Sequence, residues 1–129
     1  MTLETERGLF IKNPPWGIVQ SALGLLDPGV GNSFAVLSTG QSTYVQTLRG
    51  TNGFHLEWRV TGDDPGTYIH YRACDPEGSA GRKVLKKFDA INAGEYRDLL
   101  TLEMVISAFR SFFDRMAPPA ALRWRVLDL

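Results

Sequence analysis

The chain has 129 residues, of which 43% are hydrophobic and 11% aromatic, and its 14 basic and 14 acidic side chains cancel. This size and apolar content favour one folded domain over residues 1–129 and exclude global disorder. The neutral balance argues against a general affinity for nucleic acid, which requires a basic surface that releases counterions. The single cysteine excludes an internal disulfide.

The N-terminal segment predicts a short apolar segment followed by a helix. Residues 9–11 are apolar and are expected to form either an edge strand or a lead-in. Asn13 and the two prolines after it form a helix start, because asparagine caps helices and proline is tolerated in the first turn. Apolar residues then recur at helical spacing over residues 16–26, and the Asp-Pro-Gly sequence that follows ends the helix.

The middle of the chain predicts an antiparallel meander. Its clearest strand covers residues 54–60, where apolar and polar side chains alternate strictly. Turn sequences rich in glycine, asparagine and aspartate separate this strand from its neighbours, as expected for consecutive antiparallel strands. The strands predicted in this part of the chain are residues 34–38, 43–49, 54–60, 67–73 and 82–90.

The C-terminal part predicts an amphipathic helix and a final strand. Thr101 is a suitable N-cap, Glu103 suits the positive end of the helix dipole, and a broad apolar stripe continues to Met116. Two prolines end this helix, and residues 122–126 alternate as a short strand. Such a helix is unstable alone and must pack on the sheet. The predicted fold class is α+β, an antiparallel meander sheet of about five to six strands with two helices packed on one face.

The sequence contains no recognisable catalytic or metal-binding motif. His55 and His70 lie on different predicted strands, and no third metal ligand accompanies them. His70 and Cys74 share one strand face but lie ~13 Å apart along the chain, too far to pair as base and thiol. The glycine-rich turns lack the context of a phosphate-binding loop, and the basic strip at residues 82–87 is expected to be a solvated strand face. We therefore expect no metal, no cofactor and no enzymatic activity.

The outward face of the predicted sheet is rich in tyrosine, histidine and arginine. If Phe54, Leu56 and Trp58 point inward, the residues between them point outward. This composition is enriched at protein interfaces, and ordinary cross-strand pairing would produce a similar set. The two aspartates in the turn after residue 60 are either the rim of an interface or solvated turn acids. The candidate partner-binding residues are Tyr44, Gln46, His55, Glu57, Arg59, Asp63, Asp64, Tyr68, His70 and Arg72.

Several segments resemble small bacterial immunity proteins of polymorphic-toxin systems. The sequences YVQ at 44–46, GFHLEWR at 53–59 and YIHYRA at 68–73 resemble the middle of these proteins. The sequence LTLEMVISAFRSFF at 100–113, a proline-containing turn and LRWR at 122–125 resemble the closing helix and tryptophan strand of immunity proteins that often partner deaminase toxins. The chain departs from this family in its net charge. Many immunity proteins are acidic and so match a basic toxin, whereas this chain is neutral.

The resemblance implies a non-catalytic protein that binds a cognate toxin domain, a deaminase being one expected kind, and occludes it in a stoichiometric complex. It implies no direct contact with nucleic acid or membrane, and a monomer or weak homodimer when the toxin is absent. The start of the sequence has no signal-peptide pattern, so the cytoplasm is the expected location. Two alternatives stay open: a small-ligand-binding domain or minor enzyme with a cleft between the sheet and the C-terminal helix, and a self-associating accessory domain.

Overall fold

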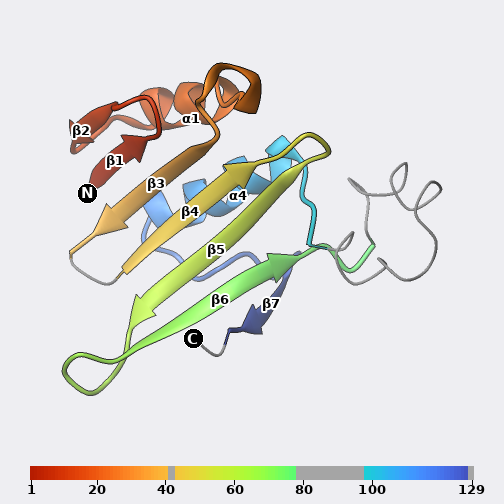
Figure 1. Ribbon diagram of the computed structural model, residues 1–129. Helices are drawn as coiled ribbons and strands as arrows, with labels where there is room; N and C mark the ends of the chain where they lie inside the picture. Colours follow the sequence, from red (N-terminus) through yellow and green to blue (C-terminus); the bar gives the residue numbers. More distant parts are fainter. Residues whose placement is uncertain (41–42, 78–97, 128–129) are drawn as a thin grey trace.

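The computed structural model describes residues 1–40, 43–77 and 98–127 (Figure 1). In these ranges the chain forms one seven-stranded antiparallel sheet with two α-helices, which confirms the predicted α+β class. The strands are β1 (Thr2–Thr5), β2 (Phe10–Lys12), β3 (Phe34–Thr39), β4 (Thr43–Arg49), β5 (Phe54–Thr61), β6 (Tyr68–Cys74) and β7 (Arg123–Val126). The helices are α1 (Trp16–Gly24), the short 3-10 helix η1 (Pro28–Val30) and α4 (Leu102–Phe113).

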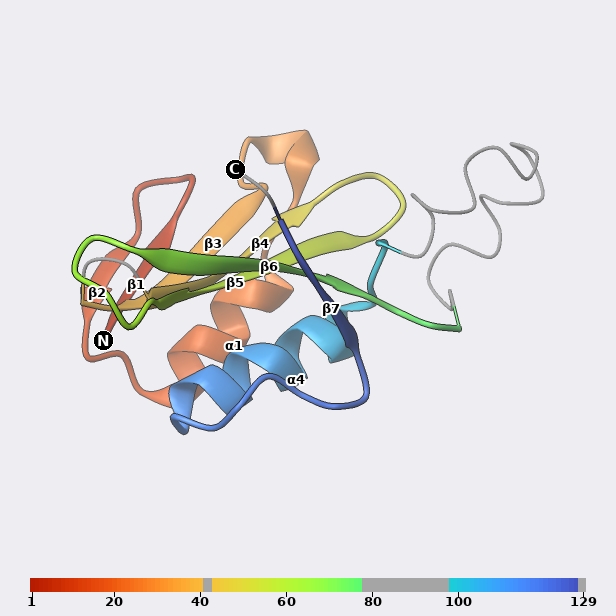
Figure 2. The same cartoon turned by 90° about the horizontal axis from the view of Figure 1, so that it is seen from below.

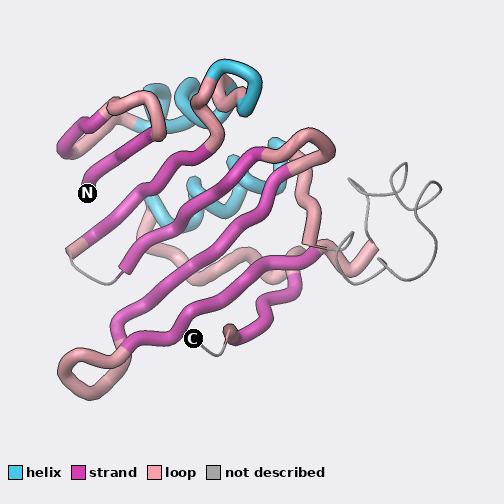
Figure 3. Tube along the Cα trace, in the orientation of Figure 1, coloured by secondary structure: helices cyan, strands magenta, loops and turns pink. Residues whose placement is uncertain are grey.

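The strands follow the order β2-β1-β3-β4-β5-β6-β7, and every neighbouring pair is antiparallel. Figure 3 shows the strands side by side in one sheet. The predicted meander is present from β3 to β6. β1 and β2 form a hairpin at one end of the sheet. After β2 the chain passes through α1 and then forms β3, which pairs with the edge of β1 opposite β2. The strand count exceeds the predicted five to six because β1 has too weak a pattern to predict, with Leu3 as its one long apolar side chain. The strand predicted over residues 82–90, with the basic strip at 82–87, lies outside the described residues.

Both α-helices lie on the same side of the sheet, as predicted (Figure 2). The N-cap of α1 is Pro15, which makes no side-chain capping bond. The expected cap, Asn13, instead accepts a hydrogen bond at 3.1 Å from the N-terminal amine. In α4 the Thr101 hydroxyl accepts a hydrogen bond from the Met104 N–H at 3.3 Å, so this cap is confirmed. No helix in the described ranges is long and apolar enough to cross a bilayer.

The core lies between the sheet and the two helices. Phe54, Leu56 and Trp58 point into it from β5, and all three are buried, as the alternation of this strand predicts. Trp58 packs edge-on against Phe112 of α4, with ring centroids 5.2 Å apart, and against Trp124 of β7 at 5.7 Å. Burying a large apolar side chain contributes about 1.5–3 kcal/mol, so these contacts hold α4 and β7 on the sheet. The helices therefore occupy one face, and the polar side of β5 lies on the other.

Candidate functional site

The sheet face opposite α1 and α4 gathers most of the predicted partner-binding residues, and we call it the free face. Cross-strand register forms two rows of side chains on it. In one row Gln46 lies opposite Glu57, Glu57 opposite Arg72, and Arg72 opposite Arg125. In the other, Tyr44 lies opposite Arg59, and Arg59 opposite His70. The outward-facing residues of β3 to β7 that define the free face are Phe34, Val36, Ser38, Tyr44, Gln46, Leu48, His55, Glu57, Arg59, Tyr68, His70, Arg72, Cys74, Arg123 and Arg125.

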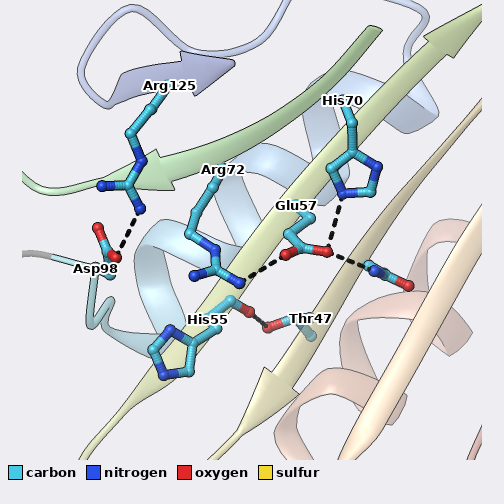
Figure 4. A network of polar contacts seen from close by, with 8 residues as sticks. Thr47, His55, Glu57, His70, Arg72, Asp98 and Arg125 are labelled. Atoms are coloured by element: carbon cyan, nitrogen blue, oxygen red, sulfur yellow. Dashed lines mark hydrogen bonds and ion pairs between the residues drawn. The ribbon is translucent and has the colours of Figure 1, made fainter. Parts of the chain in front are cut away.

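Glu57 is the centre of a polar network on the free face (Figure 4). Its Oε1 accepts a hydrogen bond from Gln46 Nε2 at 2.8 Å and lies 3.0 Å from His70 Nε2. Its Oε2 accepts a hydrogen bond from Arg72 at 2.9 Å. The two strands that flank β5, β4 and β6, thus supply partners to one carboxylate, because register places them on either side of Glu57.

The environment of Glu57 favours its charged form. Burial by itself would raise the pKa of this carboxyl, but hydrogen bonds from Arg72, His70 and Gln46 together outweigh burial and lower the pKa from its ordinary value of 4.5. Glu57 is therefore ionised at neutral pH, and its charge is compensated by Arg72. The network is a pre-ordered structural feature of the face, with each of its members held in place by the carboxylate.

Arg59 is stacked between two tyrosines beside this network. Its guanidinium carbon lies 3.4 Å from the centroid of the Tyr68 ring and 5.5 Å from that of Tyr44. Such cation–π contacts hold a guanidinium in place without neutralising its charge. Among the described residues its buried Nε has no hydrogen-bond partner. The ion pairs of the described residues likewise do not include Arg59.

His70 points to the free face but is buried there. It is only 6% exposed, because its imidazole lies against Glu57 and edge-on to the Tyr44 ring, at a centroid distance of 6.0 Å. Alternation along β6 correctly gives the direction of the side chain. Burial of His70 depends on which side chains of β4 and β5 cover it. Alternation along β6 alone does not predict those neighbours.

A hollow of about 450 Å³ adjoins the Glu57 network on the free face. One wall is apolar and comes from Phe34, Val36 and Leu48, and the other contains His55 and Glu57. Phe34 is 38% exposed and Leu48 is 49% exposed. This apolar wall is not among the predicted site residues, although Leu48 follows Tyr44 and Gln46 at the same alternating spacing. The remaining lining residues are Gln46, Thr47 and Arg72.

Several charged side chains lie outside the Glu57 network. Asp63 and Asp64 are exposed in the turn between β5 and β6, apart from the Glu57 network. Arg125, which was not predicted, lies next to Arg72 and pairs with Asp98 at 3.0 Å (Figure 4). Within the described residues no group of three or more His, Cys, Asp or Glu side chains is arranged to hold a metal ion.

Comparisons of the chain with protein-family models, with curated proteins and with solved structures found no match. The geometry of the free face is therefore the basis for a functional proposal. Its combination of a stacked arginine, two tyrosines, an ordered carboxylate network and a part-apolar hollow suits binding of another molecule through a surface.

Proposed function

We propose that this chain is an immunity protein that binds a cognate toxin domain through the free face and blocks it stoichiometrically. It acts in the cytoplasm, without a cofactor and without catalytic turnover, on a toxin domain of which a deaminase is one candidate. The proposal combines the resemblance of residues 44–125 to immunity proteins with the composition and order of the free face.

One observation carries the proposal. The free face presents Tyr44, Arg59 and Tyr68 as a stacked group next to the ordered Glu57 network. Tyrosine and arginine are enriched among the residues that dominate binding energy at protein interfaces. Their ordering before binding lowers the conformational entropy lost when the complex forms.

Blocking a toxin requires a large buried interface and slow dissociation of the complex. A stable interface buries on the order of 1,600 Å² in total, and the outward sides of β3 to β6 offer a continuous surface for such a contact. Tyr68 and Arg59 are the expected centre of the interface. Asp63 and Asp64, exposed in the adjoining turn, are its expected rim.

Co-expression tests the proposal directly. The toxin domain encoded beside this chain should arrest growth when expressed alone, and the chain should restore growth and co-purify with the toxin in equal amounts. Tyr68→Ala should abolish this protection, because it removes the ring on which Arg59 stacks. Leu25→Ala is the matched control, since Leu25 is 71% exposed at the end of α1, on the side of the sheet where the helices lie. Failure of the wild-type chain to bind the toxin or restore growth would refute the proposed function.

A second candidate function, binding of a small ligand, is favoured by the size of the hollow. Its volume of about 450 Å³ lies within the range of roughly 300–1,000 Å³ typical of ligand pockets. It opens on the free face and not between the sheet and α4, where Trp58 and Phe112 pack against each other. Native mass spectrometry of the purified chain should show a retained small molecule if this function is correct.

A further inference from the structure

Among the described residues, Arg59 is a positive charge of the free face that has no ion-pair partner. Arg72 is paired with Glu57 at 2.9 Å, and Arg125 is paired with Asp98 at 3.0 Å. Arg59 has no carboxylate at ion-pair distance in the described part of the chain, and its buried Nε lacks a hydrogen-bond partner. The charge of this guanidinium is therefore available to an anion that another molecule supplies.

The tyrosines beside Arg59 restrict its guanidinium without using its hydrogen-bond donors. Tyr68 stacks on the guanidinium at 3.4 Å and Tyr44 flanks it at 5.5 Å. A guanidinium presents donors in a planar fork that matches the two oxygens of a carboxylate. Held by stacking, this fork loses little further side-chain entropy when an anion binds.

A carboxylate fits these surroundings better than a nucleic-acid backbone does. The turn that joins β5 to β6 carries Asp63 and Asp64, both exposed, close in sequence to Tyr68. A strand of phosphates passing over Arg59 would also meet these acids, whereas a single carboxylate engages Arg59 alone. The formal net charge of zero gives no general attraction for a polyanion.

The hollow supplies a second, apolar contact at a definite spacing from Arg59. Glu57 and His55, which line the hollow, lie two and four residues from Arg59 on the same face of β5. The rise of a strand places these positions about 7 and 13 Å from Arg59. One segment of a partner can therefore reach Arg59 and the wall formed by Phe34, Val36 and Leu48 at the same time.

We infer that the partner of the free face is a protein segment that places an Asp or Glu carboxylate against Arg59 and an apolar side chain in the hollow. This inference rests on the proposed function for the identity of the partner as a toxin domain. The recognition chemistry follows from the charge of Arg59 and from the lining of the hollow. It differs from the pairing of an acidic immunity protein with a basic toxin, because here the partner supplies the acid at the centre of the contact.

Selection from a phage-displayed library of random short peptides tests this recognition chemistry without the toxin. The wild-type chain should enrich peptides that carry an Asp or Glu within a few residues of a large apolar residue. The Arg59→Glu variant should lose these peptides and enrich peptides with Lys or Arg at the acidic position. A synthetic copy of an enriched peptide should bind at least about tenfold more weakly when its acid is replaced by the matching amide.

A matched pair of variants separates Arg59 from general charge on the face. Arg59→Gln should weaken binding of the enriched peptide by at least about tenfold, whereas Arg125→Gln should change it by less than about threefold, because Arg125 is already paired with Asp98. Unfolding curves and circular dichroism of each variant check that it is folded. Enrichment without acids, an unchanged selection by Arg59→Glu, no enrichment at all, or tighter binding of a single-stranded oligonucleotide than of the peptides would each overturn the inference.

The two proposals fail in different ways. If the acidic peptides are selected but the neighbouring toxin domain neither binds nor is blocked, the proposed function fails and the recognition chemistry stands. If the toxin binds and is blocked equally well by wild type and Arg59→Glu, the recognition chemistry fails and the proposed function stands.

Discussion

At the scale of single residues, Glu57 organises the free face. Its carboxylate joins side chains of β4, β5 and β6, through Gln46, His70 and Arg72. Removing the carboxylate would leave these donors without an acceptor in a part-buried site, a loss of about 1–3 kcal/mol. The effect of Glu57 on stability is therefore expected to depend on pH.

Glu57→Gln should reduce the loss of stability in acid. The pKa of Glu57 is lowered in the folded protein, so its ionised form adds stability above its ordinary value of 4.5, and this contribution disappears as the pH falls through the folded pKa. Urea unfolding between neutral pH and acid should show a steeper loss for wild type than for Glu57→Gln. Glu4→Gln is the control, because Glu4 is exposed on β1, and it should follow the wild-type curve. Parallel curves for wild type and Glu57→Gln would contradict the prediction.

At the scale of secondary-structure elements, β5 separates two kinds of chemistry. Its residues alternate between the core under α4 and the free face, so adjacent positions have different surroundings. Trp58 is 3% exposed and contacts Phe112 and Trp124, whereas Arg59 next to it contacts Tyr44 and Tyr68 on the opposite side. Substitutions of adjacent β5 residues should therefore change the free energy of unfolding by different amounts.

Trp58→Ala should lower the free energy of unfolding by about 3–5 kcal/mol, because it removes a large side chain from a packed core. Arg59→Ala should lower it by less than about 1 kcal/mol, since it removes only cation–π contacts. Denaturant titration followed by circular dichroism measures both changes. Similar losses of unfolding free energy for the two variants would contradict the prediction that Trp58 supports the core and Arg59 does not.

The start of α4 offers a second prediction at this scale. Thr101→Ala should destabilise the protein by about 1 kcal/mol, because the hydroxyl that accepts a hydrogen bond from the Met104 N–H is lost. Thr101→Ser retains the hydroxyl and should remain close to wild type. Thermal unfolding of the three proteins compares them, and equal melting temperatures for Thr101→Ala and wild type would show that the cap adds nothing.

At the scale of the whole molecule, the two faces of the sheet differ in what covers them. The helices α1 and α4 lie on one face (Figure 2). In the described ranges the other face carries Tyr, Arg and His side chains and an open hollow. Two copies meeting through the free face would bring their Arg59 side chains into one interface, a like-charge arrangement that disfavours tight pairing.

The chain alone should therefore sediment as a monomer at micromolar concentration and form at most a weak dimer. Sedimentation velocity over a range of concentrations measures this, and raised salt should favour any dimer by screening Arg59. A tight dimer that Arg59→Glu dissociates would support the self-associating alternative in place of a toxin partner.

Much of the fold is predictable from periodicity. Strict alternation over residues 54–60 gives both the position of β5 and the directions of its side chains, and the Thr101 cap locates the start of α4. The end of α4 is less predictable: apolar residues continue to Met116, yet the helix ends at Phe113, and Arg115 adopts a positive φ of 58°. β1 is not predicted, because a four-residue segment with one buried leucine lacks a distinctive period.

The sequence by itself determined the α+β class, the meander and the set of polar side chains that point away from the core, because these depend on local periodicity and turn chemistry. Only the tertiary structure decided which of those side chains meet. It buried His70 beneath its neighbours, joined Glu57 to side chains of β4 and β6, left Arg59 without an acid in the described ranges and placed an apolar hollow beside the Glu57 network. The physical reason is register: alternation tells which face a residue occupies, but the alignment of one strand with the next sets its neighbours.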